Sequence, residues 1–150
     1  MNGRPRRVVV VLGMHRSGTS AVTRLLTLAG ATPPRELMPA NPDNPQGYWE
    51  SRRIARFNNR LLESAGTRWN DDAAIPEAWF TAADRQANRE EAAAILAEEF
   101  GSATELVLKD PRICRLLPFW QTVFDAAEIE PFGLVVVRDP LEVARSLAAR

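Results

Sequence analysis

The sequence predicts an α/β fold, a three-layer sandwich in which helices cover both faces of a central parallel sheet. Three short apolar runs, at residues 8–12, 105–108 and 132–137, are typical of strands, and segments with helical spacing separate them. Strands that alternate with helices form parallel sheets through right-handed crossovers. The chain has 150 residues, of which 45% are hydrophobic and 25% charged, and this composition suits one globular domain with a single core.

In the first part of the chain, a strand leads through a glycine-containing loop into a helix. Residues 8–12 form a continuous run of β-branched and apolar residues, as expected for a strand covered on both faces. The helix is predicted to begin near Thr19 and to end before Gly30. Its apolar face contains Val22, Leu25, Leu26 and Ala29. Five prolines in residues 31–48 then predict an extended, irregular segment, and an ordered loop of this length usually serves a site.

Helices account for most of the remaining chain outside the strands. The predicted helices are 49–65, 77–100 as one helix or two, 115–127 with Pro118 in its first turn, and a last one that Pro140 opens. This last helix has no stop signal before residue 150. We therefore expect residues 1–150 to be the N-terminal portion of a longer protein, folded as a single nucleotide-binding domain.

The composition restricts the kinds of site that the chain can hold. Its formal net charge is zero, which argues against a broad electrostatic surface for nucleic acid or anionic membranes, so an anion site must be local. The single cysteine excludes an intrachain disulfide, and no Cys/His spacing suggests zinc, so we expect no metal. No apolar run approaches the roughly 20 residues of a membrane span, and we expect a cytoplasmic protein of undetermined oligomeric state.

Residues 13–20, Gly-Met-His-Arg-Ser-Gly-Thr-Ser, are predicted to bind an anion between a strand and a helix. Glycines allow the backbone to curve around the ligand, so that successive N–H groups point at it from the positive end of the helix. Arg16 adds a charged fork, and three hydroxyl groups add donors, those of Ser17, Thr19 and Ser20. The alternative is a tight strand-to-helix turn with a capping serine.

This loop differs from the loop of ATP- and GTP-binding proteins, Gly-x-x-x-x-Gly-Lys-Ser/Thr. Gly13 and Gly18 have the same separation, but Thr19 occupies the lysine position and the basic residue is Arg16. An ordinary kinase or NTPase site would therefore lack the ammonium group that reaches the β and γ phosphates.

A second candidate anion site follows the third predicted strand. Arg138 comes directly after this strand, and Ser146 lies eight residues further on, in the last helix. Both belong to the carboxyl edge of the sheet, where open α/β sheets bind ligands. The alternative is that Arg138 pairs with Asp139 or another nearby carboxylate and that Ser146 faces solvent.

Together these segments resemble the sulfotransferases that use 3′-phosphoadenosine 5′-phosphosulfate (PAPS). The family's 5′-phosphosulfate loop has a basic residue followed by Ser-Gly-Thr-Thr or Ser, which residues 16–20 match with Arg16 in place of the more frequent Lys. In this family a strand-end Arg and a Ser eight residues later hold the 3′-phosphate of the donor, and Arg138 and Ser146 resemble that pair. The resemblance implies a P-loop NTPase-like topology and cofactor-binding roles for Arg16, Ser17, Gly18, Thr19, Ser20, Arg138 and Ser146.

The resemblance also implies an enzymatic reaction. A sulfuryl group is transferred from PAPS to a hydroxyl or amine of an acceptor, and PAP is the product. The acceptor is a glycan, a lipid, a peptide or a small alcohol, and the loop is most similar to that of bacterial members. Two alternatives stay open: a divergent small-molecule kinase with the same loop, and a non-catalytic nucleotide-binding module.

Glu50 is the candidate general base. Many family members use a histidine, but His15 lies inside the loop, where we expect a structural role. Residues 44–50, Asn-Pro-Gln-Gly-Tyr-Trp-Glu, resemble an Asn-Pro-x-Gly-Tyr-aromatic-Glu segment of bacterial sulfotransferases, and carboxylate-using branches place a Glu after the first helix. The alternative is that Glu50 only complements the N-terminus of a helix.

Lys109 is the only lysine among 19 basic residues, and it follows the second strand. A compact ammonium at this edge would stabilise charge on the bridge oxygen of the leaving group, so Lys109 is a catalytic candidate beside Glu50. The charged Arg16 of the loop is the third catalytic candidate. We expect Arg112 to help bind donor or acceptor, and Asp110 to orient both Lys109 and Arg112. Five aromatic residues are candidates for an acceptor pocket, although most are expected in the core: Trp69, Trp79, Phe80, Phe119 and Trp120.

Overall fold

The computed structural model describes residues 5–42 and 44–148, and helices separate its strands along the chain. The elements are β1 (Arg6–Leu12), α1 (Thr19–Leu28), α2 (Arg52–Ser64), α3 (Glu77–Thr81), α4 (Arg85–Phe100), β2 (Glu105–Lys109), α5 (Ile113–Ala126), β3 (Ile129–Val135) and α6 (Pro140–Ala148). The strands are parallel in the order β2-β1-β3, and Val10 of β1 lies opposite Leu108 and Gly133. The predicted α/β fold with a parallel sheet is confirmed.

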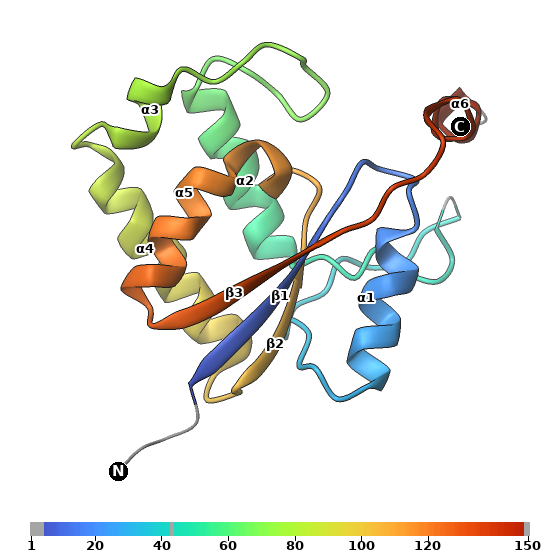
Figure 1. Ribbon diagram of the computed structural model, residues 1–150, viewed down its shortest axis with the longest axis horizontal. Helices are drawn as coiled ribbons and strands as arrows, with labels where there is room; N and C mark the ends of the chain where they lie inside the picture. The colour runs from blue at the N-terminus through green and yellow to red at the C-terminus, as the bar shows by residue number, and fades with distance from the viewer. Residues whose placement is uncertain (1–4, 43, 149–150) are drawn as a thin grey trace.

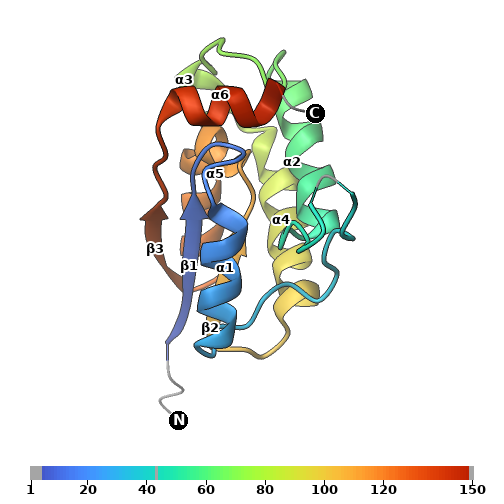
Figure 2. The same ribbon diagram turned by 90° about the vertical axis from the view of Figure 1, so that its right-hand side faces the viewer.

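Helices lie on both sides of this sheet and give the molecule three layers. α1 lies on one side, whereas α2, α4 and α5 pack against each other on the opposite side (Figure 1). α6 follows β3 and lies across the end of the sheet toward which the strands point (Figure 2). Because all strands are parallel, the segments that follow them meet at this one edge.

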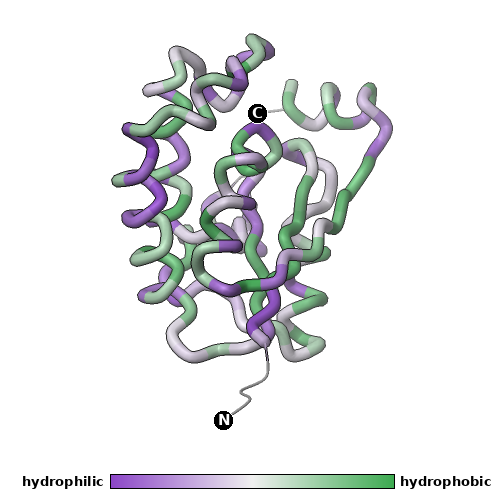
Figure 3. Tube along the Cα trace, turned by 60° about the vertical axis from the view of Figure 1, so that its left-hand side comes forward, coloured by the Kyte–Doolittle hydropathy of each residue, from purple (hydrophilic) through white to green (hydrophobic). Residues whose placement is uncertain are grey.

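The core lies between the sheet and the layer of α2, α4 and α5. The valines of β1 and the apolar residues 106–108 of β2 are buried, and green, hydrophobic stretches alternate with purple, hydrophilic ones along the trace in Figure 3. The largest fully buried side chains include Phe57, Phe119, Trp120 and Phe124. The expectation that most of the aromatic residues lie in the core is therefore correct for Phe119 and Trp120. Trp79 and Phe80 are partly buried against the same core, but Trp69 is 45% exposed.

Two predicted helices have different boundaries in the structure, and the segment 77–100, predicted as one helix or two, follows the second alternative. α2 begins at Arg52 instead of residue 49, because the Ser51 hydroxyl caps it by accepting a hydrogen bond from Ile54 N, 3.1 Å away. The segment 77–100 is two helices, α3 and α4, separated by a short turn. α5 begins at Ile113, two residues early, so that Pro118 lies inside the helix and not in its first turn.

The third strand is also displaced from the predicted run 132–137, since β3 covers Ile129–Val135. Pairing with β1 sets its position, because Arg6 lies opposite Ile129 and Leu12 opposite Val135. The apolar composition alone did not reveal this register. Val137 is 84% exposed and belongs to the connection that leads into α6.

α1 presents a different face to the sheet than its apolar pattern predicted. Its buried residues are Thr19 and Thr23, and the Thr23 hydroxyl donates to Thr19 O at 2.8 Å. Leu25, on the apolar face of this helix, is 65% exposed. In the described part of the chain, α1 is the helix on this side of a three-stranded sheet, and no further helix packs over its outer leucines. Among the described helices, none combines the length and the apolar composition that a membrane span requires.

Candidate active site

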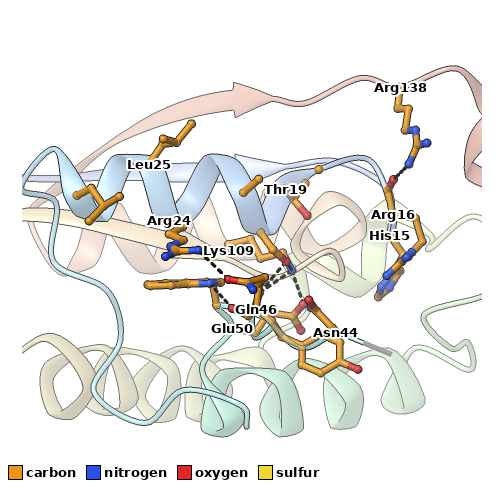
Figure 4. A pocket seen from close by; sticks show the side chains of 16 residues that line it. His15, Arg16, Thr19, Arg24, Leu25, Asn44, Gln46, Glu50, Lys109 and Arg138 are labelled. Atoms are coloured by element: carbon orange, nitrogen blue, oxygen red, sulfur yellow. Dashed lines mark hydrogen bonds and ion pairs between the residues drawn. The ribbon is translucent and has the colours of Figure 1, made fainter. Parts of the chain in front are cut away.

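A cavity of about 570 Å³ opens beside the carboxyl ends of β1 and β2, between α1 and the segment before α2 (Figure 4). Its walls come from the loop 13–20, from α1, from residues 44–50 and from the strand ends. The lining residues are His15, Arg16, Gly18, Thr19, Ser20, Ala21, Arg24, Leu25, Leu28, Asn44, Gln46, Tyr48, Trp49, Glu50, Lys109 and Arg138. Most of the residues that the sequence singled out for chemistry therefore border one cavity.

The conformation of the loop 13–20 favours glycine at positions 13 and 18. Gly13 has a φ of +153°, and a Cβ there would lie 2.7 Å from Val136 O, so a side chain does not fit. Gly18 has a φ of +94° and is the N-cap residue of α1. No side chain caps this end of α1, so the alternative of a capping serine does not apply here. The first N–H groups of α1 stay available to an anion, as its positive end would favour.

Cys114 anchors the start of this loop, a role that the sequence did not indicate. Its Sγ accepts a hydrogen bond from Gly13 N at 3.2 Å. Burial raises the pKa of the Cys114 thiol, which keeps it protonated and poorly nucleophilic. No local sequence signal pairs residues this far apart, because the contact depends on how α5 packs beside β1.

Arg16, Arg138 and Ser146 are brought together, although 122 and 130 positions separate Arg16 from the other two. Arg16 Nε donates to Ser146 Oγ at 2.8 Å, and Arg138 Nη1 donates to Arg16 O at 3.0 Å. Arg138 also pairs with Glu142, 2.9 Å away, on the surface of α6. The alternative is therefore correct for Arg138, which pairs with the nearby carboxylate of Glu142, but not for Ser146, which contacts the loop.

The three hydroxyl-bearing residues of the loop, Ser17, Thr19 and Ser20, have different surroundings. Ser17 and Thr19 are buried, with Ser17 N bonded to Met14 O at 3.2 Å. Ser20 Oγ donates to Tyr48 O at 3.1 Å and so connects α1 with the segment before α2. His15 packs edge-on against Trp69, with 4.7 Å between ring centroids, and also lines the cavity.

Lys109 and Glu50 form a buried ion pair at the centre of the cavity. Lys109 Nζ lies 2.5 Å from Glu50 Oε1, and both side chains are 4% exposed. The same ammonium donates to Tyr48 O at 3.0 Å and to Ser20 Oγ at 3.4 Å. Glu50 is not in the first turn of α2, which begins two residues later. It directly precedes the N-cap residue Ser51, so Glu50 lies at the N-terminal end of α2 and also pairs with Lys109.

Arg112 holds the second oxygen of Glu50. Its Nη1 lies 3.4 Å from Glu50 Oε2 and 2.9 Å from Asp110 Oδ1, while its Nε donates to Asn59 Oδ1 at 2.6 Å. Asp110 thus orients Arg112, as expected. It has no hydrogen bond or ion pair to Lys109 among the described contacts, and Lys109 is instead oriented by Glu50 and Tyr48.

Burial is the main influence on the acidity of Glu50. It raises the pKa of this carboxyl above its ordinary value, against the opposing effect of the Lys109 charge, and the Asp110 charge raises the pKa further. A carboxylate with a raised pKa, held by two cations beside a cavity, has the properties of a general base. Among the described residues there is no cluster of three or more His, Cys, Asp or Glu side chains that could hold a metal ion.

Comparison with known proteins gives one match. The model described as "Sulfotransferase family" matches residues 8–149, which is nearly the whole chain. No curated protein and no solved structure matches the chain.

Proposed function

The chain belongs to the sulfotransferase family, and we propose that it transfers a sulfuryl group from PAPS to a hydroxyl or amine of an acceptor, releasing PAP. The observation that supports this proposal is one cavity that has two arginines at one end and a buried glutamate–lysine ion pair beside them. Arg16 and Arg138 lie at one end of the cavity, and the buried pair of Glu50 and Lys109 lies next to them (Figure 4).

The donor fits the arginine end by its charge. PAPS carries phosphate groups at two positions of one adenosine, so it needs cationic and N–H donors at two places. The loop and the start of α1 suit the phosphosulfate group. Arg138 and Ser146 suit the 3′-phosphate, and their contacts with Arg16 keep the two groups of donors adjacent.

Glu50 and Lys109 suit the transfer step. Glu50 accepts the proton of the acceptor hydroxyl as the oxygen attacks sulfur. The new S–O bond forms while the bond between sulfur and the bridge oxygen breaks, and the bridge oxygen leaves with the electron pair. Lys109 lies 3.4 Å from the Ser20 hydroxyl of the loop, so its ammonium is placed to stabilise that developing charge. No metal ion is required in this scheme.

The same position of Lys109 favours a second candidate, a divergent small-molecule kinase. Its ammonium reaches the edge of the loop from β2, and this would replace the lysine that the loop lacks after Gly18. Such an enzyme would transfer a phosphoryl group from ATP with Mg²⁺. The Arg138 and Ser146 donors have no evident use in that reaction.

The choice of donor distinguishes the two candidates. We expect the natural full-length protein to bind PAP in the micromolar range without Mg²⁺ and to bind ATP more weakly, because the site has cations for a 3′-phosphate. Calorimetric titration with PAP, ATP and ATP with Mg²⁺ measures this preference. Mg²⁺-dependent binding of ATP that is tighter than binding of PAP would support the kinase instead.

The rate of transfer is expected to depend on pH through Glu50. The base acts in its ionised form, so kcat/KM should fall as the pH is lowered through the pKa of Glu50. Because burial raises that pKa, the fall should lie above the ordinary range of a glutamate. The measurement is kcat/KM against pH with an acceptor that does not titrate in this range.

Two variants serve as controls for the pH profile. Glu36→Gln changes an exposed carboxylate that pairs with Arg52, and it should leave the acidic limb unchanged. Glu50→Gln should abolish the limb along with most of the rate. A limb that persists in the residual activity of Glu50→Gln would assign it to another group.

A further inference from the structure

The outer face of α1 carries an apolar stripe that borders the cavity. Ala21, Leu25 and Leu28 lie on this face, and Leu25 and Leu28 are 65% and 75% exposed. Leucines at this spacing on a helix form one continuous surface. Neither leucine contributes to the core, and both line the cavity that holds Lys109 and Glu50.

The opposite wall of this part of the cavity is built by residues 44–50. Asn44 Nδ2 donates to Gly47 O at 2.8 Å, and Trp49 Nε1 donates to Gln46 O at 3.0 Å, which fixes the turn. Trp49 has a φ of +59°, an unusual conformation for a residue with a side chain, and it lines the cavity. The indole and the leucine stripe thus provide apolar surface on two sides of the same space.

Arg24 adds a positive charge at the rim. Its Nη1 donates to Gln46 Oε1 at 2.8 Å, and among the described residues its hydrogen-bond partner is this neutral amide and no carboxylate. The guanidinium is exposed and lines the cavity beside Leu25. An anionic group of a ligand at the rim could form a charged hydrogen bond with this guanidinium.

The cavity therefore has two chemically different ends. Figure 4 shows Arg138 and Arg16 at one end, Leu25 and Arg24 toward the other, and Lys109 with Glu50 between them. If a doubly phosphorylated donor occupies the arginine end, the apolar end stays open to the second substrate. A hydroxyl that reaches Glu50 from that side leaves the rest of its molecule against the leucine stripe.

We infer that the apolar end binds the acceptor, and that this acceptor is a hydroxylated amphiphile, an apolar chain or ring that also carries an anionic group. The inference rests on the proposed function, because it assigns the second substrate of the same site. Apolar surface of the ligand contacts Leu25, Leu28 and Trp49, its anionic group contacts Arg24, and its hydroxyl lies at Glu50.

The test uses the natural full-length protein saturated with PAP and three probes: ω-hydroxydodecanoate, ω-hydroxyoctanoate and dodecanol. Calorimetry measures the binding of each. The longer hydroxy acid should bind about tenfold tighter than the shorter one or better, since each fully buried methylene is worth about fourfold. It should also bind several-fold tighter than dodecanol, which lacks the charge that meets Arg24.

Variants at the stripe should change these affinities and leave PAP binding unchanged. Leu25→Ser should weaken binding of ω-hydroxydodecanoate about tenfold, because it removes most of one apolar contact. Arg24→Gln should abolish the preference for the acid over the alcohol. The matched controls are Val135→Ser, an equally exposed position on β3, and Arg56→Gln, an exposed arginine of α2 outside the cavity, and neither should affect the probes.

The possible failures are separable. If the wild-type protein does not bind PAP, the proposed function is wrong. If PAP binds but the affinities of the probes do not depend on chain length or on Leu25, this inference alone is wrong. The same holds if Leu25→Ser changes the oligomeric state or the stability and not the affinity for the probes, because the stripe would then be covered by another copy or segment.

Discussion

Glu50→Gln is expected to lower kcat by about 10²–10⁴-fold, because a positioned base contributes that much to a proton transfer. Glutamine has nearly the same shape and can still accept a hydrogen bond from Lys109, so the cavity should keep its form. The effect should therefore appear in kcat while the affinity for PAP stays close to that of the wild type. The measurement is transfer of radiolabelled sulfate from PAPS by the natural full-length protein.

Lys109→Ala belongs to the same experiment and is expected to raise the barrier by about 3–4 kcal/mol, as for the loss of one donor from an oxyanion hole. It also leaves Glu50 buried with one cation fewer, and breaking a buried ion pair costs about 3–5 kcal/mol of stability. The double variant Glu50→Gln with Lys109→Met removes both charges and should recover much of that stability without recovering activity.

The matched control for this pair is the exposed ion pair of Glu36 and Arg52. Glu36→Gln should leave the rate of transfer within about twofold, since an exposed pair contributes little. A rate in Glu50→Gln that equals the wild-type rate would remove Glu50 from the chemistry. Absence of transfer by the wild type with a broad panel of acceptors would favour a non-catalytic module.

Much of the fold was predictable because its signals are local. The β-branched run of β1, the glycines around the loop and Pro140 at the start of α6 each determine a local conformation without distant partners. The limits of β3 were not predictable in this way, because they depend on pairing with β1. The start of α2 had a local signal that was missed, since Ser51 is a preferred N-cap residue.

The site was predicted less completely, for a similar reason. Lys109 was singled out because it is the only lysine, and the structure places it against Glu50, a contact that spans 59 positions. The link from Arg112 to the second oxygen of Glu50 depends on how α5 and α2 pack, and a pattern within one segment does not reveal it. The exposure of Leu25 has no local signal either, because apolar residues at helical spacing do not show whether that face meets the core or a cavity.

Loss of PAP binding is the second large effect that we expect, and it concerns the arginine end of the cavity. Arg16→Ala and Arg138→Ala should each weaken PAP binding about tenfold to a hundredfold, because a charged hydrogen bond to phosphate is worth about 1.5–3 kcal/mol. The present partner of Arg138 is Glu142 in an exposed pair, which a phosphate can displace at small cost. Ser146→Ala should have a smaller effect, near that of one neutral hydrogen bond.

The controls for these variants must separate binding from folding. Arg56→Ala removes an exposed arginine outside the cavity and should leave the affinity for PAP unchanged. Urea denaturation of each variant verifies that the loop substitutions do not unfold the domain. The affinity for adenosine 5′-phosphosulfate, which has no 3′-phosphate, should fall in Arg16→Ala and be unaffected in Arg138→Ala.

Calorimetric titration of PAP into the natural full-length protein, Arg16→Ala and Arg138→Ala is the measurement that tests the central claim most directly. We expect micromolar binding by the wild type and losses of about tenfold or more in both variants. Affinities in the two variants that match the wild-type affinity would contradict the claim that these arginines receive the donor.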